Sequence, residues 1–326
     1  MTSPLLAVND LWVNVSSRRG HGAILRGVDL EVRPGELVGI VGETGSGKST
    51  TALAIMRLLP EAMRIERGAI TYAGVDLATA SEPALQRLRG RRLAMIFQDP
   101  RSHLNPVFPI GEQLIDVIRA HHGNKGSEEE AIRLLEQVNL PNARARLRTY
   151  PHQLSGGMAQ RVMIAMALAG QPDLLIADEP TSALDVTVQA QILALLRRLA
   201  TEQGLAVLLI SHNVAAVAQV CDRVVVMYAG SVVESAPIVP LLGAAGHPYT
   251  QGLLAAVPRV GAQASDMRGI PGRVANIFEI PAGCCAFADR CPAVMARCQA
   301  EPPLAYTLGP DHAVACFLHD GGGRLG

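Results

Sequence analysis

The residues best suited to chemistry form a short glycine-rich segment between an apolar run and a helical pattern. The segment matches G-x-x-x-x-G-K-[ST] and comprises Gly42, Glu43, Thr44, Gly45, Ser46, Gly47, Lys48, Ser49 and Thr50. In this context, glycines let backbone N–H groups converge on phosphate oxygens at the start of a helix. Lys48 would reach the terminal phosphates, and the Ser49 hydroxyl could bind Mg²⁺. We therefore predict a phosphate-binding loop rather than a glycine-rich turn with a solvated lysine.

Two adjacent carboxylates are a second candidate for phosphate chemistry. Asp178 and Glu179 end an apolar run that begins at Leu174. A carboxylate at the carboxyl end of a parallel strand lies beside the ligand crevice of an α/β protein. Asp178 could hold the metal through its water shell, and Glu179 could polarise an attacking water. A strand that ends in Asp-Glu is often only structural, so this prediction depends on the phosphate-binding loop in the same domain.

The elements that must position these residues alternate between strand-like and helical patterns. The alternating pairs are Leu37–Val41 with Thr50–Leu59, Leu174–Ala177 with Val186–Leu199, and Leu205–Ile210 with Val214–Val220. Such alternation predicts an α/β fold with a parallel, helix-covered sheet. Arg223–Tyr228 and Ser231–Glu234, joined by Ala229 and Gly230, predict a hairpin. Residues from about 93 to 166 are predicted to form a helical subdomain inserted in this body.

Further motifs accompany the loop and the carboxylates in a fixed order along the chain. They are Gln98, the run Ser155, Gly156, Gly157 and Met158, then Asp185 and His212. Alone, each is weak, since Ser-Gly-Gly commonly caps a helix. Together they resemble the full motif set of ATP-binding-cassette (ABC) ATPases over residues 5–235. The resemblance implies a P-loop NTPase cassette, in which an antiparallel β subdomain and the helical subdomain accompany the parallel-sheet core.

The resemblance also implies a role for each motif. In ABC ATPases two cassettes enclose two ATP molecules head to tail. One ATP would be served by the phosphate loop, Gln98, Asp178, Glu179 and His212, with Mg²⁺ held by Ser49, Gln98 and Asp178. Glu179 would act as general base, while His212 would hold the γ-phosphate and the attacking water. Ser155–Met158 would contact the partner cassette's ATP, since a helix start is an anion site, and Asp185 would couple the two sites.

The adenine contact departs from the family pattern. Members usually stack the adenine on an aromatic residue upstream of the phosphate loop, and Val15 stands at that place here. Trp12, the only tryptophan, lies nearby and is either a strand-core residue or a displaced stacking platform. We expect a core residue, because large apolar rings are usually buried.

Residues 1–235 are thus predicted to form the cassette, and residues 236–326 a second, smaller domain. Within the second, His247–Leu254 and Ile270–Val274 resemble the C-terminal extension of ATPase subunits from the dipeptide, oligopeptide and nickel importer group. Arg101–Val107 and Ile110–Gln113 also resemble that group, in the segment that would face a coupling helix of a membrane subunit.

The resemblance to that group implies an activity and partners. The chain would hydrolyse ATP to drive import of dipeptides or oligopeptides, with nickel or another small solute as the alternative cargo. Its partners would be a second ATPase subunit, commonly a paralogue, two transmembrane permease subunits and an extracytoplasmic substrate-binding protein. It would lie at the cytoplasmic face of the bacterial inner membrane, held there through the permeases. The sequence has neither a signal peptide nor an apolar window of membrane-spanning length, as this expectation requires.

Five of the six cysteines lie between Cys284 and Cys316, within the predicted second domain. Four thiolates form a complete ligand set for an iron–sulfur cluster or a tetrahedral metal; these are Cys285, Cys291, Cys298 and Cys316. The resemblance adds that related extensions hold [4Fe–4S], with Cys285 as the first ligand. We therefore predict a [4Fe–4S] cluster, with Zn²⁺ and free buried thiols as alternatives. Cys284 would be a neighbour, and Cys221 a core residue.

Composition argues against a nucleic-acid partner. The chain has 29 basic and 29 acidic residues and is 3% aromatic. It therefore lacks both a long-range positive field and a supply of rings for stacking on bases. A soluble ABC ATPase of DNA repair or translation is accordingly less favoured. A redox-sensing iron–sulfur regulator that binds ATP is a further, less favoured rival.

Overall fold

The computed structural model describes residues 3–17, 20–123, 126–182, 184–257, 269–273, 280, 283–321 and 323–324. The chain divides into two compact units, each built from separate stretches of sequence. The first unit comprises Met1–Leu5, Val32–Leu37 and Thr79–Ile210, and the second comprises Leu6–Glu31, Val38–Ala78 and Ser211–Gly326. Because the chain passes repeatedly between the two, neither unit matches a single continuous segment.

The sheet of the first unit is parallel, in the order β8-β7-β6. Its strands are β6 (Leu93–Ile96), β7 (Leu174–Asp178) and β8 (Ala206–Ser211), the last residue of which is assigned to the second unit. All residues of β7 and β8 are buried. Continuous apolar runs of this kind suit strands covered on both faces, so the predicted parallel sheet is confirmed here.

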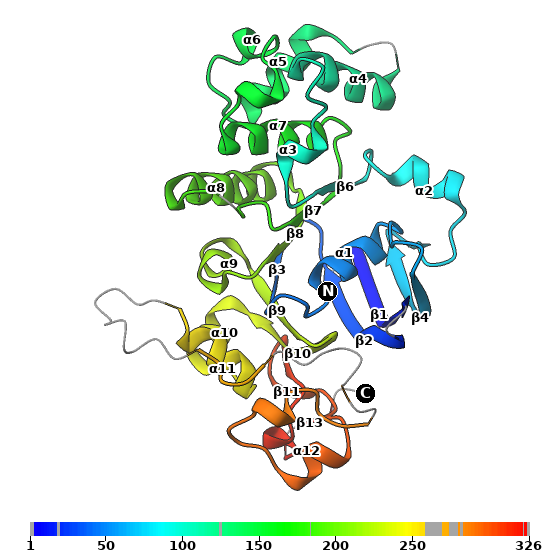
Figure 1. Ribbon diagram of the computed structural model, residues 1–326, viewed down its shortest axis with the longest axis vertical. Coiled ribbons are helices and arrows are strands. Elements are labelled where there is room, and N and C mark those ends of the chain that lie inside the picture. The colour runs from blue at the N-terminus through cyan, green and yellow to red at the C-terminus, as the bar shows by residue number, and fades with distance from the viewer. Residues whose placement is uncertain are drawn as a thin grey trace. The chain divides into compact units, whose positions relative to one another are not determined.

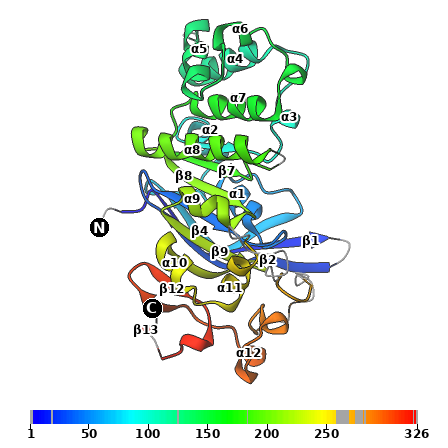
Figure 2. The same cartoon turned by 90° about the vertical axis from the view of Figure 1, so that its left-hand side faces the viewer.

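Helices α3 to α7 lie between β6 and β7 in sequence. The helices of this unit are α2 (Glu82–Leu88), α3 (Pro100–His103), α4 (Ile110–His122), α5 (Glu128–Gln137), α6 (Ala143–Arg146), α7 (Gly156–Leu168) and α8 (Val186–Gln203), with a 3₁₀ turn at Pro151–Gln153. Figure 1 shows α4, α5 and α6 gathered beside α7, on which α3, α4 and α5 pack. Helices α7 and α8 run side by side (Figure 2). The region from 93 to 166, which the sequence predicted to be mostly helical, opens with strand β6.

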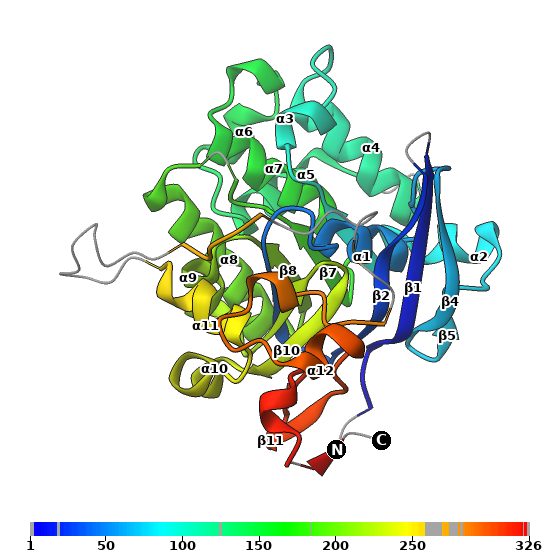
Figure 3. The ribbon, with the colours of Figure 1, turned by 60° about the horizontal axis from the view of Figure 1, so that its bottom comes forward.

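The second unit contains an antiparallel sheet in the order β2-β1-β4-β5, visible in Figure 3. Its strands are β1 (Leu6–Ser17), β2 (Gly20–Val32), β4 (Met63–Tyr72) and β5 (Val75–Asp76). A second group of strands follows the order β3-β9-β10-β12-β11-β13. These are β3 (Leu37–Val41), β9 (Arg223–Tyr228), β10 (Ser231–Pro237), β11 (Tyr306–Gly309), β12 (His312–Val314) and β13 (Gly323–Arg324). In this group β3 and β9 are parallel, and the strands after β9 pair antiparallel.

The helices of the second unit are α1 (Lys48–Ile55), α9 (Val214–Val220), α10 (Ile238–Ala244), α11 (Pro248–Ala255) and α12 (Ala296–Ala300), with 3₁₀ turns at Ala288–Arg290 and Phe317–His319. Of these, α1 and α9 were predicted from the sequence, and α9 has the predicted ends. Helix α1 ends four residues before the predicted Leu59, because Arg57 has a positive φ of 54° and leaves the helical conformation. The predicted hairpin is present, and Ala229 and Gly230 at its turn both have positive φ, as a tight primed turn requires.

Strand β12 joins residues near the C-terminus to the predicted cassette. It pairs with β10, aligning Val314 with Glu234. The Glu234 side chain is buried and accepts hydrogen bonds from the backbone N–H groups of Gly246 and His247. His312 lies 2.8 Å from the same carboxylate. This shared carboxylate ties β10, β12 and the start of α11 together, because a buried carboxylate must be satisfied by nearby donors.

Among the described residues, no helix is both long and apolar enough to cross a membrane.

The second unit should lose stability in acid through His247. Burial lowers the pKa of this imidazole to about 4, against an ordinary value of 6.5. Between these pH values the unfolded chain binds a proton that the folded chain does not, so acid favours unfolding. The loss should reach about 2 kcal/mol by pH 5 and be measurable as a fall in the urea midpoint from pH 7 to pH 5.

The variant His247→Asn separates this effect from general acid denaturation. In α11 the His247 ring accepts the Tyr249 N–H at the helix start, a place that asparagine also fills well. The variant should therefore lose less stability than the parent between pH 7 and pH 5. His152→Asn, at an exposed position, is the control. Equal losses in the parent and in both variants would contradict the assignment.

Candidate functional site

The phosphate loop is packed so closely that two of its glycines cannot be replaced without displacement. Gly42 has a φ of 156°, and a Cβ there would lie 2.2 Å from the carbonyl oxygen of Met227. Gly47, with a φ of 100°, forms the N-cap of α1, and its Cβ would lie 2.7 Å from Leu25. Because side chains are excluded at both ends, the loop presents backbone to a ligand, as a phosphate cradle requires.

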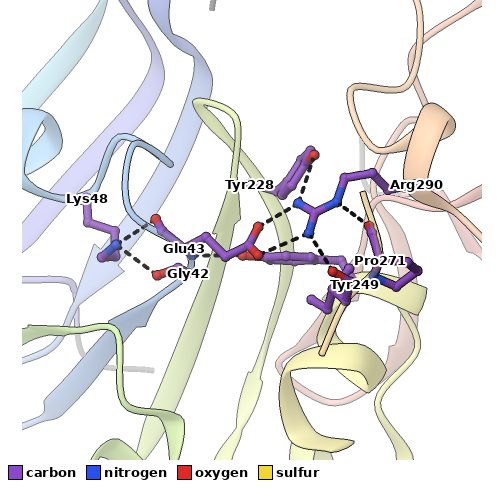
Figure 4. Close-up of polar contacts among 8 residues, drawn as sticks. Gly42, Glu43, Lys48, Tyr228, Tyr249, Pro271 and Arg290 are labelled. Atoms are coloured by element: carbon purple, nitrogen blue, oxygen red, sulfur yellow. Dashed lines mark hydrogen bonds and ion pairs between the residues drawn. The ribbon is translucent and has the colours of Figure 1, made fainter. Parts of the chain in front are cut away.

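Lys48 is buried, and its amino group is folded into the loop. Its Nζ donates hydrogen bonds of 2.9 Å to the carbonyl oxygens of Gly42 and Glu43 (Figure 4). Ser46 is also buried, whereas Ser49 in the first turn of α1 is exposed. The remaining loop residues differ in exposure: Thr44 and Gly45 are exposed, and Thr50 is half-buried. The loop thus combines a fixed ammonium group with an accessible hydroxyl, which fits the donor set expected for a phosphate and its Mg²⁺.

The predicted carboxylates lie at the carboxyl end of β7. Asp178 is buried, while Glu179 is half-buried and has a positive φ of 48°. The Glu179 backbone N–H donates to the carbonyl oxygen of Ile210 on β8 at 2.9 Å. A glutamate in the left-handed region is strained, and such strain often occurs at functional sites. The backbone therefore turns the Glu179 side chain at the strand end and holds it there by a bond to the neighbouring strand.

Gln98 contacts the predicted general base directly. Its side-chain Nε2 donates to Glu179 Oε2 at 3.0 Å, and its backbone carbonyl oxygen accepts from the Ser182 hydroxyl at 3.3 Å. The sequence predicted Gln98 as an ATP-binding residue and a Mg²⁺ ligand, so its contact with Glu179 is an addition to the prediction. The first unit thus gathers Gln98, Asp178 and Glu179, whereas the phosphate loop and the exposed His212 belong to the second unit.

Ser155 and its glycines have a structural role within the chain. The Ser155 hydroxyl accepts the Met158 N–H at 3.3 Å and caps α7. A Cβ at Gly157 would lie 2.4 Å from Val188 on α8, and one at Gly156 would lie 3.1 Å from Leu184. The two glycines therefore allow the start of α7 to approach α8. Because Ser155 is exposed, the helix start also remains accessible to an anion.

Asp185 likewise caps a helix, accepting the Val188 N–H at 3.0 Å at the start of α8. Ala183, which precedes it in the same motif, lies outside the described residues.

The structure corrects the expectation for Trp12. Its neighbours Leu11 and Val13 are fully buried, but Trp12 is only half-buried. The Arg67 guanidinium lies 4.5 Å above the indole ring, and the indole N–H donates to Asp10 at 2.7 Å. An irregular register in β1 on either side of Trp12 turns the ring out of the core, so it is not a strand-core residue. Val15 is buried in β1.

Two residues near the phosphate loop were not predicted from the sequence. Arg290 donates to both carboxylate oxygens of Glu43, and Tyr249 accepts the Glu43 N–H. These hydrogen bonds from Arg290 to Glu43 raise the pKa of Arg290 above its ordinary value. Both partners lie more than 200 residues along the chain from Glu43. No local pattern marks such a contact, so only the fold reveals it.

The four predicted cysteine ligands form no disulfides, and Cys285 interacts electrostatically with the other three. Burial, with smaller contributions from Cys298, Cys316 and Cys291, raises the pKa of Cys285 to about 11. Cys285 packs against the cluster of Ala288, Cys298 and Phe317. However, in the described part of the chain no three or more His, Cys, Asp or Glu side chains form a group that could hold a metal ion. Cys221 is buried, in agreement with its predicted core position.

Comparison with known proteins decides the family. Residues 25–182 match the ABC transporter family model, and residues 233–298 match the model for the oligopeptide/dipeptide transporter C-terminal region. The chain is 47% identical to the probable D,D-dipeptide transport ATP-binding protein DdpD of Escherichia coli strain K12, covering 97% of each chain. It is 46% identical to the oligopeptide transport ATP-binding protein OppD of Salmonella typhimurium strain LT2, covering 96% of this chain and 93% of the relative. The chain belongs to the peptide-transporter branch of the ABC ATP-binding proteins.

Solved structures confirm the P-loop cassette fold. The dimeric ATP-binding cassette MJ0796, bound to ADP and phosphate in a post-hydrolysis state, matches with a TM-score of 0.64 and 26% identity. The match covers 72% of this chain and 98% of that cassette. CbiO1 of Clostridium perfringens, part of the ABC transporter complex cbiONQ, matches with a TM-score of 0.62 and 26% identity over 74% of this chain and 91% of its own. This ABC protein is thus an ATPase coupled to transport, as its motifs predicted.

Replacement of Lys48 should strongly weaken nucleotide binding by this ABC ATPase. Lys48→Ala removes the buried ammonium group, and charge-assisted hydrogen bonds to phosphate are among the stronger ones in proteins. We expect the Kd for Mg-ATP to rise about a hundredfold, or about 3 kcal/mol, in titration calorimetry. Lys125→Ala, at the other lysine of the chain, is the matched control. An unchanged Kd in a folded Lys48→Ala variant would contradict the assignment of the loop.

Proposed function

We propose that this chain is the ATP-hydrolysing subunit of an importer for dipeptides or oligopeptides. One observation carries the proposal: a cassette match and an oligopeptide/dipeptide transporter C-terminal match occur in the same chain. The near full-length similarity to relatives named for oligopeptide and D,D-dipeptide transport supports the same substrate class. Residues 1–235 would form the cassette, and residues 236–326 the extension that characterises this group.

Within one chain, each motif would have a separate task. The phosphate loop and Lys48 would hold the phosphates of ATP, with Mg²⁺ bound through Ser49, Gln98 and Asp178. Bound Mg²⁺ would neutralise charge that develops on the phosphates. Glu179 would accept a proton from the attacking water, and the 3.0 Å bond from Gln98 would keep its carboxylate in position. His212 would hold the γ-phosphate.

Dimerisation of two cassettes would complete the site. Ser155–Met158 would bind the γ-phosphate of ATP held by the partner cassette, using the accessible start of α7. Asp185 would couple the two sites from the start of α8. The partner cassette would be a paralogue, as is common in this importer group. ATP-driven closure of the pair would then move the membrane subunits, and hydrolysis would reset it.

The remaining partners follow from the importer proposal. Two transmembrane permease subunits would hold the chain at the cytoplasmic face of the bacterial inner membrane, and an extracytoplasmic binding protein would deliver the cargo. Val107 and Phe108, which follow the Gln98 segment, are 71% and 49% exposed and would be available to a permease helix. An importer of nickel or another small solute in the same group is the alternative, because the ATPase subunit does not contact the cargo.

ATP hydrolysis by the assembled importer should respond to peptide. In liposomes that contain the permeases and both ATPases, binding protein loaded with di- or oligopeptide should stimulate phosphate release. Glu179→Gln should retain ATP binding and reduce turnover about 10²- to 10⁴-fold, because it removes a general base. Glu129→Gln, at an exposed position on α5, is the matched control. Stimulation by a nickel chelate but by no peptide would support the alternative cargo, and normal turnover by Glu179→Gln would refute the catalytic role.

We also propose that Cys285, Cys291, Cys298 and Cys316 hold a [4Fe–4S] cluster, with Zn²⁺ as the alternative. The presence of these four cysteines in one short stretch of the chain supports this. The thiols would have to lose their protons and draw together, because the described residues contain no ready group for a metal ion. A structural role is the default, since ATP hydrolysis requires no electrons.

Metal analysis of protein purified without oxygen tests the cluster proposal. About four iron and four sulfide per chain are expected, and Cys298→Ser should lose them. Cys284→Ser, at the neighbouring thiol that is not assigned as a ligand, should retain them. One zinc per chain would support the alternative, and an absence of both metals would contradict a metal site.

A further inference from the structure

Residues of the C-terminal extension hydrogen-bond Glu43 of the phosphate loop. Arg290 closes the 3₁₀ turn Ala288–Arg290, and its two terminal nitrogens donate to the two carboxylate oxygens of Glu43 at 2.7 and 3.1 Å (Figure 4). The Arg290 side chain is 5% exposed and that of Glu43 is 26% exposed. A buried, two-point contact of this kind fixes both direction and distance, which a surface ion pair does not.

Arg290 is itself held in place by the extension and by β9. Its Nε donates to the carbonyl oxygen of Pro271 at 2.9 Å, and one terminal nitrogen donates to that of Ile270 at 3.2 Å. The rings of Tyr228 and Phe287 lie 5.7 and 6.0 Å from the guanidinium carbon. Several donors of the guanidinium are thus used at once, so its orientation is set before any nucleotide binds.

Tyr249 binds the backbone of the same loop residue. Its hydroxyl accepts the Glu43 N–H at 2.8 Å, and the side chain is fully buried against Tyr228 and Phe287. Glu43 is therefore held at both its side chain and its amide by residues from α11 and the 3₁₀ turn. Its carbonyl oxygen in turn accepts the Lys48 amino group at 2.9 Å. A short chain of hydrogen bonds thus joins the extension to the phosphate-binding lysine.

Because Glu43 is negatively charged, its contact with Arg290 should affect the affinity of the loop for ATP. A carboxylate in a phosphate loop repels the polyphosphate, and partial burial strengthens the repulsion. The Arg290 guanidinium neutralises that carboxylate. We infer that Arg290, supported by Tyr249, is a positioning residue that sets the ATP affinity of the cassette by neutralising Glu43 and fixing the phosphate loop. The C-terminal extension is then part of the nucleotide site, in addition to any role in metal binding or assembly.

Arg290→Met tests the inference, since methionine retains much of the apolar stem and removes the charge. We expect the Kd of the full-length chain for Mg-ATP to rise about tenfold, because Glu43 is left uncompensated. In the assembled ATPase, KM should rise with a smaller change in kcat. The double variant Glu43→Gln with Arg290→Met should recover most of the lost affinity. Arg297→Met is the matched control, because Arg297 pairs with Glu301 and Asp320 within the extension.

Other outcomes would overturn the inference. These are an unchanged Kd in folded Arg290→Met, an equal loss in Arg297→Met, or no recovery in the double variant. If Arg290→Met does not fold, Tyr249→Phe carries the test, because it removes only the hydroxyl that accepts the Glu43 N–H. Its Kd should rise about threefold, and an unchanged value would contradict the inference. ATP binding by the isolated chain is independent of the imported solute, so a failure of the peptide proposal leaves this test intact.

Discussion

The phosphate loop must keep an uncommon backbone conformation around the buried Lys48 amino group. Several elements of the second unit stabilise this conformation. The loop follows β3, whose parallel partner β9 brings the Met227 carbonyl oxygen against Gly42. The turn after β9 supplies Gly230, whose N–H donates to the Ser46 carbonyl oxygen at 3.0 Å. Buried groups of this kind are costly unless each finds a partner. The loop is therefore supported on its backbone before any ligand arrives.

The C-terminal extension adds further contacts that hold the phosphate loop. Through Arg290 and Tyr249 it binds Glu43, and through β12 it pairs with β10, the strand that follows β9. Glu234 binds the backbone where α11 begins, close in sequence to Tyr249. A segment that the sequence presents as an added domain is thus built into the sheet and the loop. The extension can therefore affect nucleotide binding, because its folding positions Arg290 and Arg290 binds Glu43 of the phosphate loop.

Local patterns predicted the ATPase family but not the contacts between distant segments. The phosphate loop, the Asp178–Glu179 pair and the Ser155 cap each depend on a few adjacent residues, so their types could be recognised directly. The hairpin at Ala229–Gly230 was predicted for the same reason. Helix α1 ended early because Arg57 adopts a positive φ, which no periodic pattern marks.

Three features could not be read locally. Trp12 leaves the core because β1 changes register around it, and the contact of Gln98 with Glu179 joins residues 81 positions apart. The Arg290–Glu43 pair spans 247 positions. Such contacts arise only when the chain folds, and charge alone does not select one arginine among many.

Amide hydrogen exchange across residues 42–48 tests the central claim most directly, because it reports how firmly the loop is held without nucleotide. The account predicts that Arg290→Met accelerates exchange in these residues of the full-length chain, whereas Arg297→Met does not. Faster exchange confined to the extension, with the loop unchanged, would contradict the claim that the extension holds the phosphate loop.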